Sequence, residues 1–248
     1  MAERKTTKNR VGGTQRASAG SKTKINKHKR QRPVGRRTSR MSPTVREREI
    51  VSGAVSFFSE FGFEGQTREL AKKLKITQPL LYRYFPTKDA LIERVYQDIL
   101  VGGWNPLWEA RIVDRSRPMK QRLDEFYQDY SKVIVTYEWV RLFMFAGLKG
   151  LDFNRRYLKL LRERIFVKIV EELRFHFGLK STADVPVSAI EIDSIWSLHA
   201  AIFYLGVRKW IYRMSVPDDL TPIIKAKVIA FVDGVGAILS DEARDRSN

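Results

Sequence analysis

Hydrophobic residues recur every three or four positions along most of the chain from residue 44 to residue 240. The first such stripe lies between residues 44 and 61 and is formed by Ile50, Ala54, Phe57, Phe58 and Phe61. This spacing places the stripe on one face of a helix, which then buries it against a core. No stretch alternates with the period of two that marks a strand, and no solenoid repeat occurs. The pattern therefore predicts an all-α protein.

Residues 67 to 88 predict two short helices joined by a tight turn. Leu70, Ala71 and Leu74 share one face of the first helix, and we expect Thr67 to cap its N-terminus. Residues 75 and 76 make the turn.

The second short helix is expected to begin after Thr77, whose hydroxyl suits an N-cap. Pro79 lies near its start, where a missing N–H costs little. Leu81 and Phe85 are four residues apart and face inward, and Pro86 ends the helix. A longer helix capped by Thr87 follows, and its hydrophobic positions are Leu91, Ile92, Val95, Tyr96 and Ile99.

Two short helices with a tight turn are typical of a helix-turn-helix DNA reader, in which the second helix enters the major groove. Base edges are then contacted by residues near the N-terminus of that helix, and neighbouring groups hold phosphates. The candidate DNA contacts in and beside this unit are Thr67, Lys75, Thr77, Gln78, Pro79, Leu80, Tyr82, Arg83, Tyr84 and Lys88.

Residues 44 to about 100 resemble the DNA-binding domain of the TetR (tetracycline-repressor-like) family of transcription regulators. The matching pieces are Phe61-Gly62-Phe63, Arg68-Glu69-Leu70-Ala71, and Leu81-Tyr82-Arg83-Tyr84-Phe85-Pro86-Thr87-Lys88. The resemblance implies a two-fold dimer and a recognition helix from about Gln78 to Tyr84. It also implies phosphate contacts from Tyr84, Lys88 and Thr67.

Two departures from the family pattern affect the expected site. Gly65-Gln66-Thr67 is one residue shorter than the usual connection, which bears on the role of Thr67. Lys75 stands in the turn where the family often has glycine. A left-handed backbone there costs a residue other than glycine about 1–2 kcal/mol, and Lys75 could offset this by lying near phosphates.

Residues 118 to 240 predict five more helices, at about 118–136, 138–149, 154–177, 188–214 and 219–240. With the first four, the chain is expected to have about nine helices. In the last one, Ala226, Ala230 and Gly234 recur every four residues. Small residues at this spacing let helices approach closely. They fit either packing within the protein or, as the resemblance implies, dimerisation through the last two helices.

Aromatic residues crowd the C-terminal half of the chain. A helical bundle with such a lining can hold a small, largely apolar ligand, although an aromatic stripe is more often part of a hydrophobic core. The expected effector pocket is formed by Trp104, Tyr130, Trp139, Phe143 and His199. For His199 the first interpretation is a hydrogen-bonded histidine of the core, and a ligand contact is the alternative.

Charge is concentrated at the N-terminus. Of the net charge of +18, residues 1 to 42 carry +13, from 14 Lys and Arg against Glu3. So few hydrophobic residues predict a disordered tail, which serves either as a solubilising extension or as a basic arm that follows phosphates. The expected domains are this tail, a DNA-binding domain at 43–91, and a C-terminal domain for effector binding and dimerisation at 92–248.

Several classes of function lack support in the sequence. The chain has no cysteine, which excludes disulfides, thiolate catalysis and cysteine-bound metal. No histidine and carboxylate set has metal-site spacing, so no cofactor or metal is expected. We also expect no membrane span and no secretory signal.

Together these features predict a cytoplasmic, nucleoid-associated DNA-binding regulator that binds a palindromic operator as a homodimer. A repressor released by a small apolar or aromatic effector is the first interpretation, and activation stays open. The alternatives are an architectural or silencing DNA-binding protein without an effector, and an enzyme that has kept a regulator scaffold.

Overall fold

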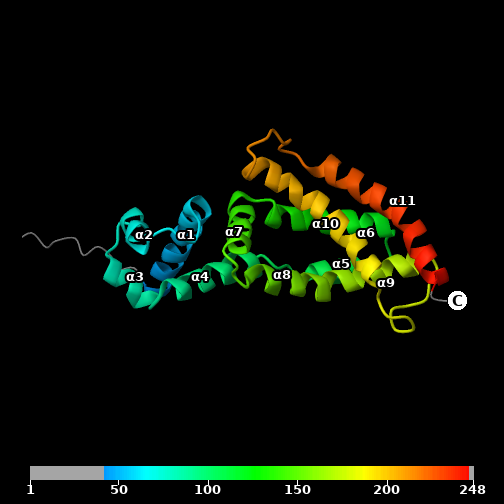
Figure 1. Cartoon of the computed structure of the whole chain (residues 1–248), viewed down its shortest axis with the longest axis horizontal. Helices are drawn as coiled ribbons and strands as arrows, with labels where there is room; N and C mark the ends of the chain where they lie inside the picture. Colours follow the sequence, from blue (N-terminus) through cyan, green and yellow to red (C-terminus); the bar gives the residue numbers. More distant parts are fainter. Residues whose placement is uncertain (1–41, 246–248) are drawn as a thin grey trace, which may run out of the picture. The chain divides into compact units, whose positions relative to one another are not determined.

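The computed structural model describes residues 42–245, with side chains to residue 240, and is helical throughout that part of the chain (Figure 1). The N-terminal helices are α1 (Pro43–Phe61), α2 (Thr67–Lys73), α3 (Gln78–Tyr84) and α4 (Lys88–Tyr96), which continues as the π-helical turn η1 (Gln97–Val101). The C-terminal helices are α5 (Leu107–Val113), α6 (Met119–Ile134), α7 (Tyr137–Leu148), α8 (Phe153–Leu161), η2 (Arg162–Phe166), α9 (Val167–His176), α10 (Ala189–Trp210) and α11 (Thr221–Asp245).

The described residues form ten continuous helices, because η2 joins α8 to α9. This is one helix more than the nine or so expected, because α5 was not predicted. This helix has only seven residues, and its N-cap is Pro106, which offers no capping side chain. Short helices without a polar cap leave little trace in a sequence.

The boundaries of the first helix follow from its sequence. Ser42 caps α1 by accepting a hydrogen bond from the Val45 N–H at 3.3 Å. Gly62 ends the helix with φ of 72°, a left-handed conformation that favours glycine.

One hydrophobic core runs from α1 to α11. Within it α1 packs against α4 and α7, α6 packs against α5 and α11, and α10 packs against α7 and α11. The described residues form one compact unit. The boundary expected near residue 91 therefore stays a prediction, and the basic tail lies outside the described residues.

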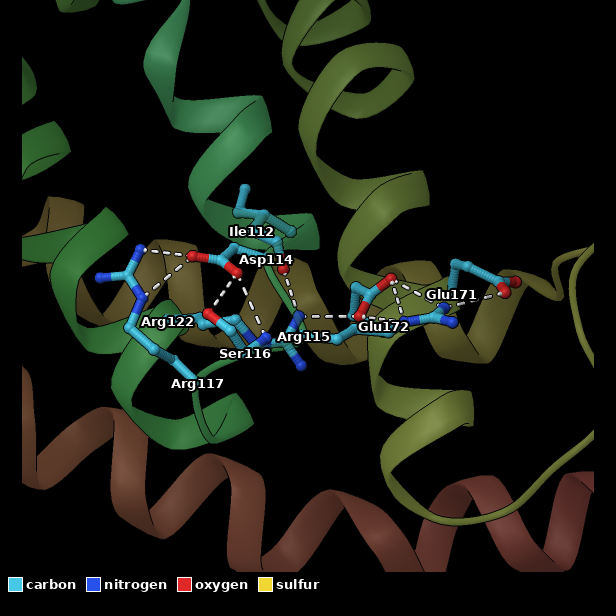
Figure 2. A network of polar contacts seen from close by, with 8 residues as sticks. All are labelled: Ile112, Asp114, Arg115, Ser116, Arg117, Arg122, Glu171 and Glu172. Atoms are coloured by element: carbon cyan, nitrogen blue, oxygen red, sulfur yellow. Dashed lines mark hydrogen bonds and ion pairs between the residues drawn. The ribbon is translucent and has the colours of Figure 1, made fainter.

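A network of charged side chains joins the loop between α5 and α6 to α9 (Figure 2). Arg122 donates hydrogen bonds to the Ile112 carbonyl and, at 2.7 Å, to Glu172. Arg115 donates to the same carboxylate at 2.9–3.2 Å. Burial raises the pKa of Glu172, but these two arginines more than offset it, so the pKa lies below its ordinary value. The buried carboxylate is therefore ionised and paired.

One helix in the described part of the chain, α10, is long and apolar enough to cross a membrane by length and composition. The expectation that the chain has no membrane span stays a prediction. Half of the apolar window of α10 is buried inside the protein.

Candidate nucleic-acid interface

The helix-turn-helix is formed by α2, a four-residue connection (residues 74–77) and α3. The turn closes through hydrogen bonds from the Ile76 N–H to the Ala71 carbonyl at 3.0 Å and from the Lys75 N–H to the Lys72 carbonyl. Lys75 has φ of 55° and so adopts the left-handed conformation that favours glycine. Its side chain is exposed beside α3.

Thr67 was expected to cap α2, and this expectation was wrong. Gln66 occupies the N-cap position and makes no side-chain cap, while Thr67 is the first residue of the helix. The buried Thr67 hydroxyl instead lies 3.0 Å from the Tyr82 hydroxyl and accepts a hydrogen bond from Gln78 Nε2 at 3.1 Å. These contacts join the start of α2 to two residues of α3, and they depend on tertiary structure that a local pattern does not contain.

The start and the buried face of α3 agree with the sequence prediction. The Thr77 hydroxyl caps α3 by accepting from the Leu80 N–H at 3.3 Å. Leu81 and Phe85 are buried in the core. The other side of α3 carries the exposed residues Pro79, Tyr82 and Arg83 and the half-buried residues Gln78, Leu80 and Tyr84.

The start of α4 lies directly after this helix. Thr87 caps α4 through a hydrogen bond from the Ala90 N–H at 3.0 Å, as expected. Lys88, half-buried, is the first residue of α4. A helix N-terminus favours negative charge, so this end of α4 suits a phosphate contact.

A hollow of about 660 Å³ lies where the N-terminal parts of α2 and α3 meet, and among its lining residues are Arg68, Lys72 and Gln78. Arg68 and Lys72 are exposed and four residues apart on α2. The sequence prediction missed them as candidate phosphate contacts, although their i, i+4 spacing places both on one face.

The DNA-binding helices are tied to the rest of the bundle by two arginines. Arg156 of α8 donates to both carboxylate oxygens of Glu93 on α4, at 2.8 and 2.9 Å. Arg141 of α7 donates to the carbonyls of Ser59 and Glu60 near the end of α1. Both arginines hold elements of the reader at fixed positions on the C-terminal helices.

The predicted dimer residues lie on the uncovered face of α11. Ala226, Ala230 and Gly234 are all exposed, and Ile229 and Ile238 beside them are about two-fifths exposed. On α10, which lies alongside α11 (Figure 1), Ile190 and Tyr204 are also half exposed. Gly206, a further small residue of α10, instead packs inside the protein against Val140.

The five residues expected to form an effector pocket belong to one aromatic cluster. Tyr130, Trp139 and His199 are buried, and Trp104 and Phe143 are partly buried. The Trp139 ring stacks on Phe143 at 4.7 Å between ring centroids, and the Tyr130 ring lies 5.8 Å from His199. The Trp104 ring contacts the Trp108 ring, which in turn contacts the Tyr130 ring.

His199 was expected to be hydrogen-bonded if it belonged to the core, and this was wrong for one ring nitrogen. Its Nδ1 atom is buried and has no partner among the described residues. Burial lowers the pKa of His199 to about 4, so the ring is neutral at pH 7. Within residues 42–240, no group of three or more His, Asp or Glu side chains could hold a metal ion.

An all-helical fold with this helix-turn-helix near its N-terminal end is typical of DNA-binding regulatory proteins. Residues 50–95 match the family model described as bacterial regulatory proteins, tetR family. Over 110 residues the chain is 29% identical to the HTH-type transcriptional regulator RutR of Escherichia coli, a match that covers 44% of this chain and 43% of that protein. The matched stretch therefore spans less than half of the length of this relative.

Solved structures extend the likeness in fold to most of the chain. A TetR-like transcriptional regulator from a Rhodococcus species covers 79% of this chain and all of its own, with a TM-score of 0.58 and 19% identity. A tetR-family transcriptional regulator from Streptomyces coelicolor covers 83% of this chain and 87% of its own, with a TM-score of 0.56 and 18% identity. The chain therefore carries a TetR-family helix-turn-helix at residues 50–95, and its fold is similar to that of solved TetR-like regulators.

Proposed function

We propose that the protein is a homodimeric repressor that reads a palindromic operator with α3 and leaves it when a small effector binds the C-terminal bundle. The observation that carries the DNA-reading part is the side-chain arrangement of α3. Its inner face is fixed by Leu81 and Phe85, while Gln78 and Arg83 stay accessible on the other side. Arg and Gln side chains read guanine and adenine edges in the major groove.

Phosphate contacts would then come from groups around α3. Tyr84, Thr67 and Lys88 are the contacts that the family resemblance implies, and Lys75 is a further one. Lys75, Arg68 and Lys72 are exposed beside the recognition helix. Phosphate contacts set the register of the protein on DNA, and base contacts supply specificity.

A second copy of the chain is the proposed occupant of the exposed face of α10 and α11. Ala226, Ala230 and Gly234 permit close approach of two helices, and Ile229 and Ile238 offer hydrophobic area at the same surface. Two copies would form a four-helix contact that places two recognition helices on half-sites about 34–36 Å apart.

The effector would act by shifting α4, which begins in the reader and ends against the bundle. The Arg156–Glu93 pair supports this role because it joins α4 to α8 of the bundle. A ligand shifts the spacing of the recognition helices only to the extent that it prefers one spacing. Operator DNA must then weaken ligand binding by the same factor by which the ligand weakens DNA binding.

The test begins with selection from random duplex DNA, which should return an inverted repeat protected as two half-sites by one dimer. Recovery of no shared sequence would contradict the proposal and favour the architectural alternative. Calorimetry of an effector with and without the selected operator then tests the switch. Equal affinities in the two titrations would show binding without regulation. In this account the protein acts in the cytoplasm at the nucleoid.

A further inference from the structure

Five rings of the aromatic cluster form a closed circuit that spans four helices: Tyr130 on α6, Tyr157 on α8, Trp139 on α7, and His199 and Phe203 on α10. The Tyr130 and Tyr157 hydroxyls are 3.0 Å apart. The ring centroids of Tyr157 and Trp139 are 5.3 Å apart, and those of Trp139 and Phe203 are 5.7 Å apart. Phe203 and His199 are 6.4 Å apart, and His199 lies 5.8 Å from Tyr130, which closes the circuit.

Polar groups on this circuit lack partners. Trp139 Nε1 and His199 Nδ1 are buried without a hydrogen-bond partner among the described residues, on side chains that are 2% and 6% exposed. The Tyr130 and Tyr157 hydroxyls share one hydrogen bond, which uses only one of their two protons. Buried polar groups without partners are rare in native proteins and point to a missing partner.

Two other tryptophans of the protein have hydrogen-bond partners for their indole N–H groups. Trp108 Nε1 donates to Asp129 at 2.9 Å, and Trp210 Nε1 donates to the Val135 carbonyl at 2.7 Å. Two buried indole N–H groups have no partner among the described residues, that of Trp139 on the circuit and that of Trp104 beside it.

The circuit also carries no charge at neutral pH. Burial keeps His199 neutral by lowering its pKa and keeps Tyr130 and Tyr157 protonated by raising theirs. An anionic ligand would lose its hydration here and meet no cation on the circuit, which is costly. The indole N–H and the spare hydroxyl are donors, so a ligand that satisfies them must supply acceptors.

We propose that this circuit binds an uncharged, planar molecule that carries hydrogen-bond acceptor atoms, such as a neutral aromatic carbonyl or heteroaromatic compound. This proposal rests on the effector-responsive function proposed above and specifies the chemical class of the effector. Flat rings suit stacking against the circuit, and a carbonyl oxygen or ring nitrogen would accept from Trp139 Nε1. Trp104 lies outside the circuit, and its unpaired Nε1 is not needed for this recognition.

The test compares three probes of nearly equal shape on the free, full-length protein without DNA. The probes are 2-acetylnaphthalene, which is neutral with an acceptor, 2-ethylnaphthalene, which lacks the acceptor, and 2-naphthoate, which is charged. Nitrogen-15 NMR of the tryptophan indoles reports binding at Trp139, with the paired indole of Trp210 as the internal control. The acetyl probe should shift the Trp139 signal and bind about tenfold more tightly than either of the others.

Two variants show whether the preference for the acetyl probe comes from the N–H of Trp139 or from the packing of its ring. Trp139→Phe keeps an aromatic ring but removes the N–H, so the acetyl and ethyl probes should bind equally, while Trp210→Phe should keep the acetyl preference. If Trp139→Phe does not fold, the relative affinities of the three probes for the unaltered protein still test the proposed ligand class. Equal binding of the acetyl and ethyl probes, tighter binding of naphthoate, or no shift at Trp139 would overturn the inference.

Operator binding is measured separately by fluorescence anisotropy. If the protein binds its operator but does not prefer the acetyl probe, the proposed ligand site is wrong and the proposed regulator function is unaffected. If the protein prefers the acetyl probe but binds no operator, the ligand site is supported and the proposed regulator function is wrong.

Discussion

Arg156 and Glu93 form a two-pronged ion pair between α8 and α4, with N–O distances of 2.8 and 2.9 Å. The Arg156 guanidinium also lies 4.3 Å from the centre of the Tyr96 ring. The hydrogen bond from Arg156 is the largest cause that lowers the pKa of Glu93. This pair joins the last helix of the helix-turn-helix region to the C-terminal bundle and is one of several contacts between them.

The first prediction concerns the strength of this contact. Both side chains are about two-fifths exposed, so a double-mutant cycle of Arg156→Ala and Glu93→Gln should give a coupling energy of at most about 1 kcal/mol. Arg156→Ala alone should cost more than Glu93→Gln, because it also removes the contact with the Tyr96 ring. Urea unfolding of the four proteins measures this. Equal losses for the two single variants would show that the ring contact contributes nothing.

Local signals in the sequence were enough to predict the DNA-binding region. Thr77 and Thr87 cap the helices expected of them, and Leu81 and Phe85 are buried at the predicted spacing. These features depend on residues within four positions of one another. Thr67 shows the limit, because its partner Tyr82 lies 15 residues away and only the folded turn brings them together.

The C-terminal region was less predictable for a related reason. Its helices were visible from periodicity, except for α5, which is short and has proline as its N-cap residue. The sequence could not say which small residue faces outward. Ala230 is exposed on α11, whereas Gly206 of α10 is buried against Val140. Helical spacing alone does not distinguish an outer face from an inner one.

The second prediction is a loss of stability on acidification that is traceable to one histidine. The pKa of His199 is lowered to about 4 by burial, against about 6.5 in an unfolded chain. As pH falls from about 6.5 to about 4, the unfolded state binds a proton that the folded state does not. The free energy of unfolding should therefore fall by about 3 kcal/mol over this window.

Urea unfolding between pH 4 and pH 8 measures the effect. His199→Phe should remove this part of the slope, and His176→Phe, which alters an exposed histidine, should leave it. Glu172, whose pKa is lowered in the folded protein, adds a further loss only as pH falls below about 4.3. An unchanged slope in His199→Phe would mean that the buried ring is not neutral.

The third prediction is that residues 1–42 contribute to the affinity for DNA but not to the preference for the operator sequence. Removal of residues 1–42 deletes 14 positive charges, so affinity for random DNA should fall and its dependence on salt should become shallower. Preference for the operator should survive, because the proposed reading residues lie on α3. Binding to operator and random duplexes across salt concentrations tests this. Loss of the preference itself would show that the tail reads sequence.

The fourth prediction places the dimer contact on α11. Ala230→Arg introduces a bulky charge at an exposed position in the small-residue face and should give a monomer on sizing chromatography with weakened operator binding. Ala110→Arg is the matched control, since Ala110 is also an exposed helical alanine but lies on α5. If Ala230→Arg remains a dimer, the subunits meet elsewhere.

The most direct test of DNA reading by α3 is the operator affinity of Arg83→Ala and Gln78→Ala, measured by anisotropy against operator and random duplexes. Each should weaken operator binding by about 1–3 kcal/mol and leave binding to random DNA nearly unchanged. Lys88→Ala should weaken both duplexes alike, and Arg162→Ala, which removes an exposed charge on η2, should weaken neither. Folded Arg83→Ala and Gln78→Ala proteins that bind the operator as tightly as the unaltered protein would contradict the account.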